Sequence, residues 1–275
     1  MAADVEFRRV MSSATNDDVL IPLLRLYLYD PHFRAFEVPT DAWHERKPDG
    51  YFHPSTHPLW TERQLYYYAL YFRNLIHEPM DPHSTMAITQ GNFWHAFMQN
   101  CLEDMGVLRI CNPGKKTPHE RVERYVSDRE LGARGWMDGE LVPDKLSIDE
   151  PEGLEIKSMS TRLLASCPKG TPTDPAKLIW LKIRHPDYYA QAQEYLRMSG
   201  LSVQRMLIIS IGYPFVMVEI VIPYSWADSS EVAAKYRRAR QAAAERRPPP
   251  PCCAPRSKES KVCVARNVCS IGRIP

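Results

Sequence analysis

The sequence predicts a mixed α/β protein in which helices flank a mixed central β-sheet, with a further helical portion at the N-terminal end. One observation is a series of short alternating or apolar runs separated by residues typical of turns. Another is a set of longer segments in which apolar residues recur at helical spacing. The chain has 275 residues, 44% hydrophobic and 25% charged, which is enough for one large domain with a helical subdomain.

The N-terminal third is predicted to be mainly helical. Residues 16–18 can cap a helix that runs through residues 19–29. Residues 30–59 are rich in proline, histidine and aromatic residues and are predicted to form a loop. Two further helices are expected, at about 61–74 and 89–105.

The rest of the chain is predicted to supply the sheet and its covering helices. Strands are expected at 107–110, 120–127, 134–142, 153–158, 203–211 and 215–222. The second of these is expected to pair with the third, and the last two to form a hairpin or consecutive strands. Helices are expected at 158–166, at 186–199 with Gly200 as its C-cap, and at 228–247, with a loop at 167–175.

Two acidic residues and one lysine lie on predicted neighbouring strands. Asp138 belongs to strand 134–142, whereas Glu155 and Lys157 share one face of strand 153–158, because side chains alternate along a strand. Two carboxylates bind hard divalent cations such as Mg²⁺, and a nearby lysine can orient a water, help deprotonate it or stabilise phosphate charge. Such a set suits phosphodiester hydrolysis, although the same residue pattern also occurs often by chance.

Two predicted helices place further polar residues around this set. Gly91 and His95 lie on the upstream helix, and Gln191 and Tyr195 lie one turn apart on the downstream helix. The order is therefore G-x-x-x-H, G-x-x-D-G, E-x-K and Q-x-x-x-Y. Over about residues 50–222, this order resembles the PD-(D/E)XK nuclease superfamily. Within it, the similarity is to the RecB-type exonucleases, which include the small CRISPR-adaptation nucleases and their bacteriophage relatives.

The resemblance implies a restriction-endonuclease-like core at 106–225, preceded by a helical portion at 1–105 that includes the G-x-x-x-H helix. The residues that it assigns to catalysis are Asp138, Glu155, Lys157, Gln191 and Tyr195. Those that it assigns to Mg²⁺ or Mn²⁺ are His95, Asp138, Glu155 and the backbone carbonyl of Ile156. From the residues alone, the favoured interpretation of His95 is a half-buried helix histidine, and Tyr195 is equally a packing residue.

Basic residues indicate where DNA would be contacted. The last segment, 226–275, contains a basic helix in which Arg237 and Arg238 are expected to meet phosphates, the alternative being a solvated helix face. Arg63 matches an arginine of a Cys-Pro-Arg-Arg-Leu-x-Tyr-like segment in the resembling nucleases and is assigned to DNA as well.

Four of the seven cysteines lie in the C-terminal tail: Cys252, Cys253, Cys263 and Cys269. Thiolates select Zn²⁺ or iron–sulfur clusters. RecB-type relatives often hold a 4Fe–4S cluster with three terminal cysteines and one earlier cysteine, but Thr61 and Ser260 stand at two of the matching positions here. The residues leave open a site made by the four tail cysteines, a site that includes Cys101 or Cys111, and a tail with free thiols.

The composition of the chain indicates the cellular compartment more clearly than it indicates the function. A net charge of +2 does not by itself argue for nucleic-acid binding. The sequence contains no apolar run of about eighteen residues, so no transmembrane helix is expected. The first residues also lack the apolar core of a signal peptide. We therefore expect a cytoplasmic protein with reduced thiols and no membrane partner, in the host cytoplasm if the origin is a bacteriophage.

The motifs together predict a metal-dependent DNA nuclease, and the resemblance implies an exonuclease that hydrolyses single-stranded DNA ends in recombination or repair. One alternative is a DNA-binding recombination or replication accessory factor with an inactive site. Another is a restriction-type endonuclease on the same fold, which would cut closed circular DNA. The resemblance also implies partners: DNA with free ends, further copies of the chain, and recombination or replication proteins.

Overall fold

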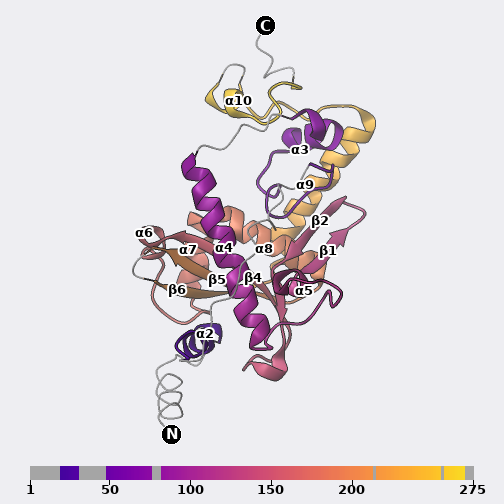
Figure 1. Cartoon of the computed structure of the whole chain (residues 1–275). Coiled ribbons are helices and arrows are strands. Elements are labelled where there is room, and N and C mark those ends of the chain that lie inside the picture. Colours follow the sequence, from indigo (N-terminus) through magenta and orange to yellow (C-terminus); the bar gives the residue numbers. More distant parts are fainter. Residues whose placement is uncertain (1–18, 31–47, 76–81, 213–214, 255–256, 270–275) are drawn as a thin grey trace.

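The computed structural model describes residues 19–30, 48–75, 82–212, 215–254 and 257–269, and it confirms a mixed α/β fold (Figure 1). The strands are β1 (Arg124–Asp128), β2 (Ala133–Met137), β3 (Gly139–Leu141), β4 (Glu152–Ser160), β5 (Val203–Ile211) and β6 (Met217–Pro223). The α-helices are α2 (Leu20–Leu28), α3 (Glu62–Tyr71), α4 (Pro82–Asp104), α5 (Pro118–Val122), α6 (Thr161–Leu164), α7 (Pro175–Arg184), α8 (Pro186–Ser199), α9 (Trp226–Glu245) and α10 (Lys258–Val262). Two short 3-10 helices lie at Phe72–Asn74 and Pro143–Lys145.

The strands form two sheets. The central sheet has the order β3-β4-β5-β6, in which β4 and β5 are parallel and the outer pairs are antiparallel. Strands β1 and β2 form a separate antiparallel hairpin. The predicted mixed sheet is therefore confirmed.

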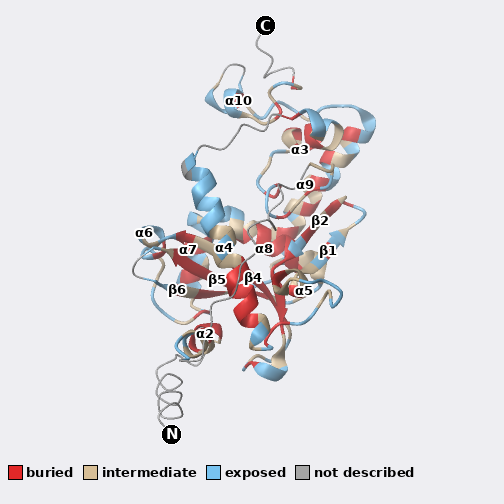
Figure 2. Cartoon of the chain, in the orientation of Figure 1, coloured by how far each residue is buried: buried red, intermediate tan, exposed pale blue. Residues whose placement is uncertain are grey.

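Helices cover both faces of the central sheet, and strand β5 shows how. Leu207 and Ile209 pack into the cluster that includes α2 and α4, whereas Met206 and Ile208 pack into the cluster that includes α7 and α8. A strand buried on both faces is apolar at nearly every position rather than alternating. Figure 2 shows this continuous buried layer through the middle of the molecule.

A buried carboxylate of the central sheet binds the backbone at the start of the first described helix. The expected cap, residues 16–18, lies outside the described residues. Glu219 of β6 accepts hydrogen bonds from the backbone N–H groups of Leu20 and Ile21, at 2.8 and 2.5 Å, and pairs with Arg205 at 3.0 Å. The negative charge at the helix start and the ion pair join α2 to the sheet.

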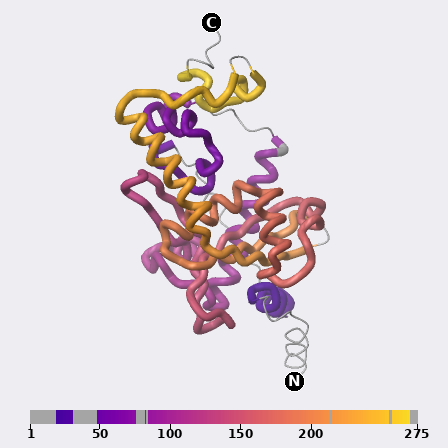
Figure 3. Tube along the Cα trace, turned by 180° about the vertical axis from the view of Figure 1, so that it is seen from behind, coloured from indigo at the N-terminus to yellow at the C-terminus, as the bar shows by residue number. Residues whose placement is uncertain are grey.

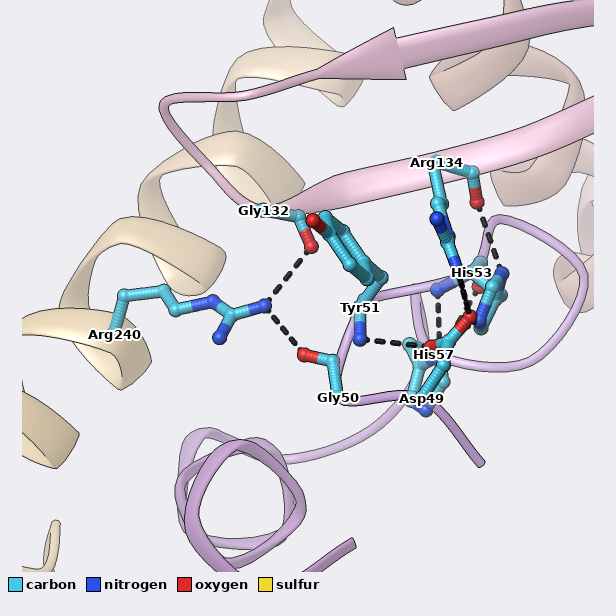
Figure 4. A network of polar contacts seen from close by, with 8 residues as sticks. All are labelled: Asp49, Gly50, Tyr51, His53, His57, Gly132, Arg134 and Arg240. Carbon is cyan, nitrogen blue, oxygen red and sulfur yellow. Dashed lines mark hydrogen bonds and ion pairs between the residues drawn. The ribbon is translucent and has the colours of Figure 1, made fainter. Parts of the chain in front are cut away.

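A separate hydrophobic cluster joins the region of α3 to the C-terminal part of the described chain. Helix α3 packs against α9, and the segment after α9 returns over α3, as the view from behind shows (Figure 3). Arg240 of α9 donates hydrogen bonds to the carbonyls of Gly50 and Gly132, which fastens α9 to the segment before α3 (Figure 4).

Several predicted elements differ from the observed ones. Residues 107–110 form no strand, only an isolated bridge between Leu108 and Leu141. Residues 120–127 divide into the end of α5 and β1, because Pro118 begins a helical turn before the strand. Helix α7 lies between two prolines and was not predicted.

The predicted strand 134–142 is two strands. It ends as β2 at Met137 and resumes as β3 at Gly139, and the two belong to different sheets. Asp138 occupies the junction between them. Among the described residues, no helix is long and apolar enough to cross a bilayer.

Candidate active site

The site lies at an open edge of the central sheet. Strand β3 pairs with β4 only from Glu152 to Leu154, so no strand in the described part of the chain continues this edge beyond Leu154. Asp138 takes over at this point, because its Oδ2 accepts a hydrogen bond of 2.6 Å from the backbone N–H of Ile156. The break between β2 and β3 thus fixes a buried carboxylate beside the part of β4 that β3 does not pair with.

Helix α4 brings His95 to the same carboxylate. His95 Nε2 lies 2.6 Å from Asp138 Oδ2. Burial opposes the charged imidazolium, but the Asp138 carboxylate outweighs it and the pKa of His95 is raised. Gly91 permits the approach of this helix, because a Cβ there would lie 2.9 Å from Ser158 Oγ of β4. The G-x-x-x-H spacing therefore has a structural reason. Gly91 lets the helix approach β4, and His95, one turn later, reaches Asp138.

Strand β4 supplies the second carboxylate and the lysine. Lys157 Nζ lies 2.7 Å from Glu155 Oε1, as alternation along the strand predicts. Gln191 of α8 donates a hydrogen bond of 2.7 Å to the same oxygen, and Gln204 of β5 donates one of 3.5 Å to Oε2. Glu155 is therefore held from three sides.

The electrostatics of these groups are strongly coupled. Burial, and then the negative charge of Asp138, raise the pKa of Glu155 to about 7, against the opposing effect of Lys157. Burial disfavours the ammonium of Lys157, but the carboxylates of Glu155 and Asp138 outweigh it and raise its pKa. Lys157 Nζ also lies 5.0 Å from the centre of the Tyr188 ring, a cation–π contact.

The residues suit a divalent cation by type. Carboxylate oxygens and an imidazole are ligands for Mg²⁺ or Mn²⁺, and a bound cation would relieve the unfavourable burial of the Glu155 charge. His95 Nδ1 is buried and has no hydrogen-bond partner among the described residues. As they stand, no three histidine, cysteine or acidic side chains of the described residues are grouped closely enough to hold an ion. Ile156 contacts Asp138 through its backbone N–H, whereas its backbone carbonyl was predicted to be the metal ligand.

Tyr195 lies near the site but is packed. It is almost fully buried in a cluster with Val126 and Met137, and its ring lies against Gly135, where a Cβ would be 2.8 Å away. This position between α8 and the β1–β2 hairpin is that of a packing residue. The predicted contact between Tyr195 and DNA stays a prediction.

Sequence reasoning missed three residues around the site. Gln99, one turn after His95, donates a hydrogen bond of 2.7 Å to the backbone carbonyl of Asp138. Tyr188 and Gln204 contact Lys157 and Glu155, as described above. The available signals were helical spacing for Gln99 and Tyr188, and a polar residue in an apolar strand for Gln204.

The four tail cysteines line one small cavity together with residues of α3. Arg63 Nε donates to Cys269 Sγ at 3.4 Å, and Gln64 Nε2 donates to Cys263 Sγ at 3.9 Å. Cys101 lies elsewhere, on the core-facing side of α4. At the position of the relatives' early cysteine, Thr61 forms a capping box with Gln64.

The arginines assigned to DNA have partners in the protein. Arg63 is buried and also donates to the carbonyl of Pro249. Arg237 and Arg238 are exposed, and lie 3.5 Å from Glu130 and 2.5 Å from Glu62. Their positions tie α9 and the tail to neighbouring segments, so contact with DNA by these three residues stays a prediction.

Comparison with known proteins adds little. No family model matches the chain, and no curated protein matches it. Among solved structures, one titled "Crystal structure of SSO0001" is similar at 13% sequence identity and a TM-score of 0.39. The alignment covers 84% of this chain and 91% of that one. A likeness this low supports no argument about fold or function.

Proposed function

We propose that the protein is a divalent-metal-dependent deoxyribonuclease that acts as an exonuclease on single-stranded DNA ends in recombination or repair. The observation that carries this proposal is the convergence of His95, Asp138, Glu155 and Lys157 at the open edge of β4. The preference for ends comes from the resemblance to RecB-type exonucleases.

The residues of the candidate site can each be given a part in such a reaction. Asp138, Glu155 and His95 would hold Mg²⁺ or Mn²⁺, which when bound would supply Lewis-acid stabilisation of the phosphate charge. Lys157 places an ammonium beside Glu155, where it can orient a water and neutralise charge that develops on a phosphate. Gln191 fixes the orientation of the Glu155 carboxylate.

The mode of cleavage is tested with a panel of substrates. End-labelled linear single strands, linear duplexes and closed circular DNA are incubated with Mg²⁺, Mn²⁺ or EDTA. We expect metal-dependent loss of linear single strands, no loss with EDTA, and intact circles. Cleavage of closed circles would instead indicate an endonuclease. Binding to DNA without cleavage in any metal would contradict the proposal and favour an accessory factor.

We also propose that the tail cysteines hold Zn²⁺ or a 4Fe–4S cluster, which rests on their shared cavity. Protein purified without oxygen should contain about one zinc or about four iron atoms per chain by elemental analysis. A cluster would also absorb visible light. Cys263→Ser should lose the metal, whereas Cys167→Ser, which alters a thiol outside the cavity, should retain it. Metal-free protein with intact folding would contradict this assignment.

A further inference from the structure

The outward face of the β1–β2 hairpin is aromatic. Tyr125 and Trp136 are directly opposed across the two strands, with ring centroids 4.9 Å apart. They are 46% and 36% exposed. Beside them, the Arg134 guanidinium lies 4.1 Å from the centre of the Tyr51 ring, which is 40% exposed. We call Tyr51, Tyr125, Arg134 and Trp136 the aromatic face.

The fold of the protein does not require these rings outside. The opposite face of the hairpin already packs against α8, through Val126, Met137 and the contact of Gly135 with Tyr195. A two-stranded sheet with one face on the core normally shows polar residues on the other face. Contiguous exposed aromatic residues are uncommon in a protein without a ligand or partner at that place.

The surroundings of the aromatic face carry positive charge. Tyr125 lines an open pocket together with Arg109, Arg124 and Glu140. Arg109, an exposed arginine, lies 2.5 Å from Glu140, whereas Arg124 is on the Val126 face of β1 and donates a hydrogen bond of 3.0 Å to the Ser199 carbonyl of α8. Arg134 is balanced by Asp49 at 2.6 Å, and it holds its guanidinium on Tyr51 (Figure 4).

The aromatic face also leads to the candidate active site. Strand β2 ends at Met137, and Asp138 follows directly. Trp136 is two residues before Asp138, which corresponds to about 7 Å along an extended chain. Trp136 thus lies on the strand that runs directly into the carboxylate at the edge of β4.

We propose that the aromatic face stacks the bases of single-stranded DNA and guides the strand toward Asp138, an inference that rests on the proposed function. Bases of a single strand offer free π-faces to aromatic rings, whereas those of a duplex are already stacked on each other. Stacking tolerates any sequence, and the positive charges of Arg109 and Arg134 suit the phosphates of a single strand.

Binding is measured by fluorescence anisotropy with a labelled oligothymidylate and with a duplex of equal length. The protein carries Lys157→Ala, so that cleavage does not interfere. Adding Trp136→Ala or Tyr125→Leu should weaken binding to the single strand by about fivefold to 150-fold, the loss expected for one stacked base. Trp226→Ala is the control, because Trp226 is 73% exposed at the start of α9, away from the hairpin.

Tyr125→Leu keeps the proposal testable if Trp136→Ala fails to fold. It keeps an apolar side chain and lies on the strand that does not lead to Asp138. Single-strand affinity unchanged in both hairpin variants would overturn the inference, as would an equal loss of affinity for the duplex. Specific loss in a protein that never cuts DNA would sink the nuclease proposal alone. Normal cutting by a wild-type protein whose hairpin variants bind normally would sink the stacking proposal alone.

Discussion

At the edge of β4, the Asp138 carboxylate accepts a backbone hydrogen bond that a neighbouring strand would otherwise accept. Asp138 satisfies the backbone N–H of Ile156 and also holds His95, so its position is fixed by both main chain and side chain. The sequence predicted Asp138 as a candidate because its spacing to Glu155 and Lys157 is local information. It could not predict the contact with Ile156, because that depends on where β3 stops pairing.

A residue far from the catalytic set provides a test of stability against pH. His57 is buried among the rings of Phe52, Trp60 and Tyr68. Its Nδ1 accepts a hydrogen bond of 2.7 Å from the backbone N–H of His53. Burial, and then the neighbouring His53, lower the pKa of His57 to about 3. The native protein therefore keeps this ring neutral at pH values where an unfolded chain would protonate it.

We expect the contribution of His57 to the free energy of unfolding to fall as the pH drops below about 6.5, the ordinary pKa of histidine. In that window the unfolded chain binds a proton at His57 and the folded chain does not, which costs about 1.4 kcal/mol per pH unit. Urea unfolding at pH 7 and pH 5 should show a larger loss in wild type than in His57→Gln. Equal losses in the two proteins would show that His57 does not contribute.

At the scale of elements, local patterns predicted the type of an element better than its boundaries. Helix α8, with Gly200 in the left-handed conformation at its C-cap, and strand β4 both follow the sequence expectation. The division of 134–142 into β2 and β3 was missed, since a change of sheet leaves the alternation of residues intact. Helix α7, which begins at Pro175, was missed because residues 176–185, between the predicted loop 167–175 and the predicted helix 186–199, were assigned to no element.

The packing of α8 on the hairpin depends on a glycine, which gives a prediction with a matched control. A Cβ at Gly135 would lie 2.8 Å from the Tyr195 ring and 3.1 Å from Pro54. Gly135→Ala should lower the free energy of unfolding by about 1–3 kcal/mol, because neither ring can move easily. Gly114→Ala meets no atom within 4 Å and should have little effect. Similar urea midpoints for the two variants would contradict the described packing.

At the scale of the whole molecule, segments far apart in sequence form one layer. Helix α3, helix α9 and the tail share a hydrophobic cluster, so residues 52–75 of the predicted segment 1–105 pack against the predicted segment 226–275 (Figure 1). This long-range contact places Arg63 beside Cys269, a pairing that spacing along the chain could not indicate. It also explains why a basic helix can have structural partners for several of its charges.

The central claim is that the residues gathered at the edge of β4 cut DNA. The most direct measurement is the rate of Mg²⁺-dependent loss of an end-labelled single strand by wild type, Lys157→Ala and Lys182→Ala. Lys182 is the control, because it is an exposed lysine that pairs with Asp228 at 3.2 Å. Lys157→Ala should be slower by about a hundredfold or more, and Lys182→Ala should match wild type. Wild-type rates in Lys157→Ala would contradict the claim.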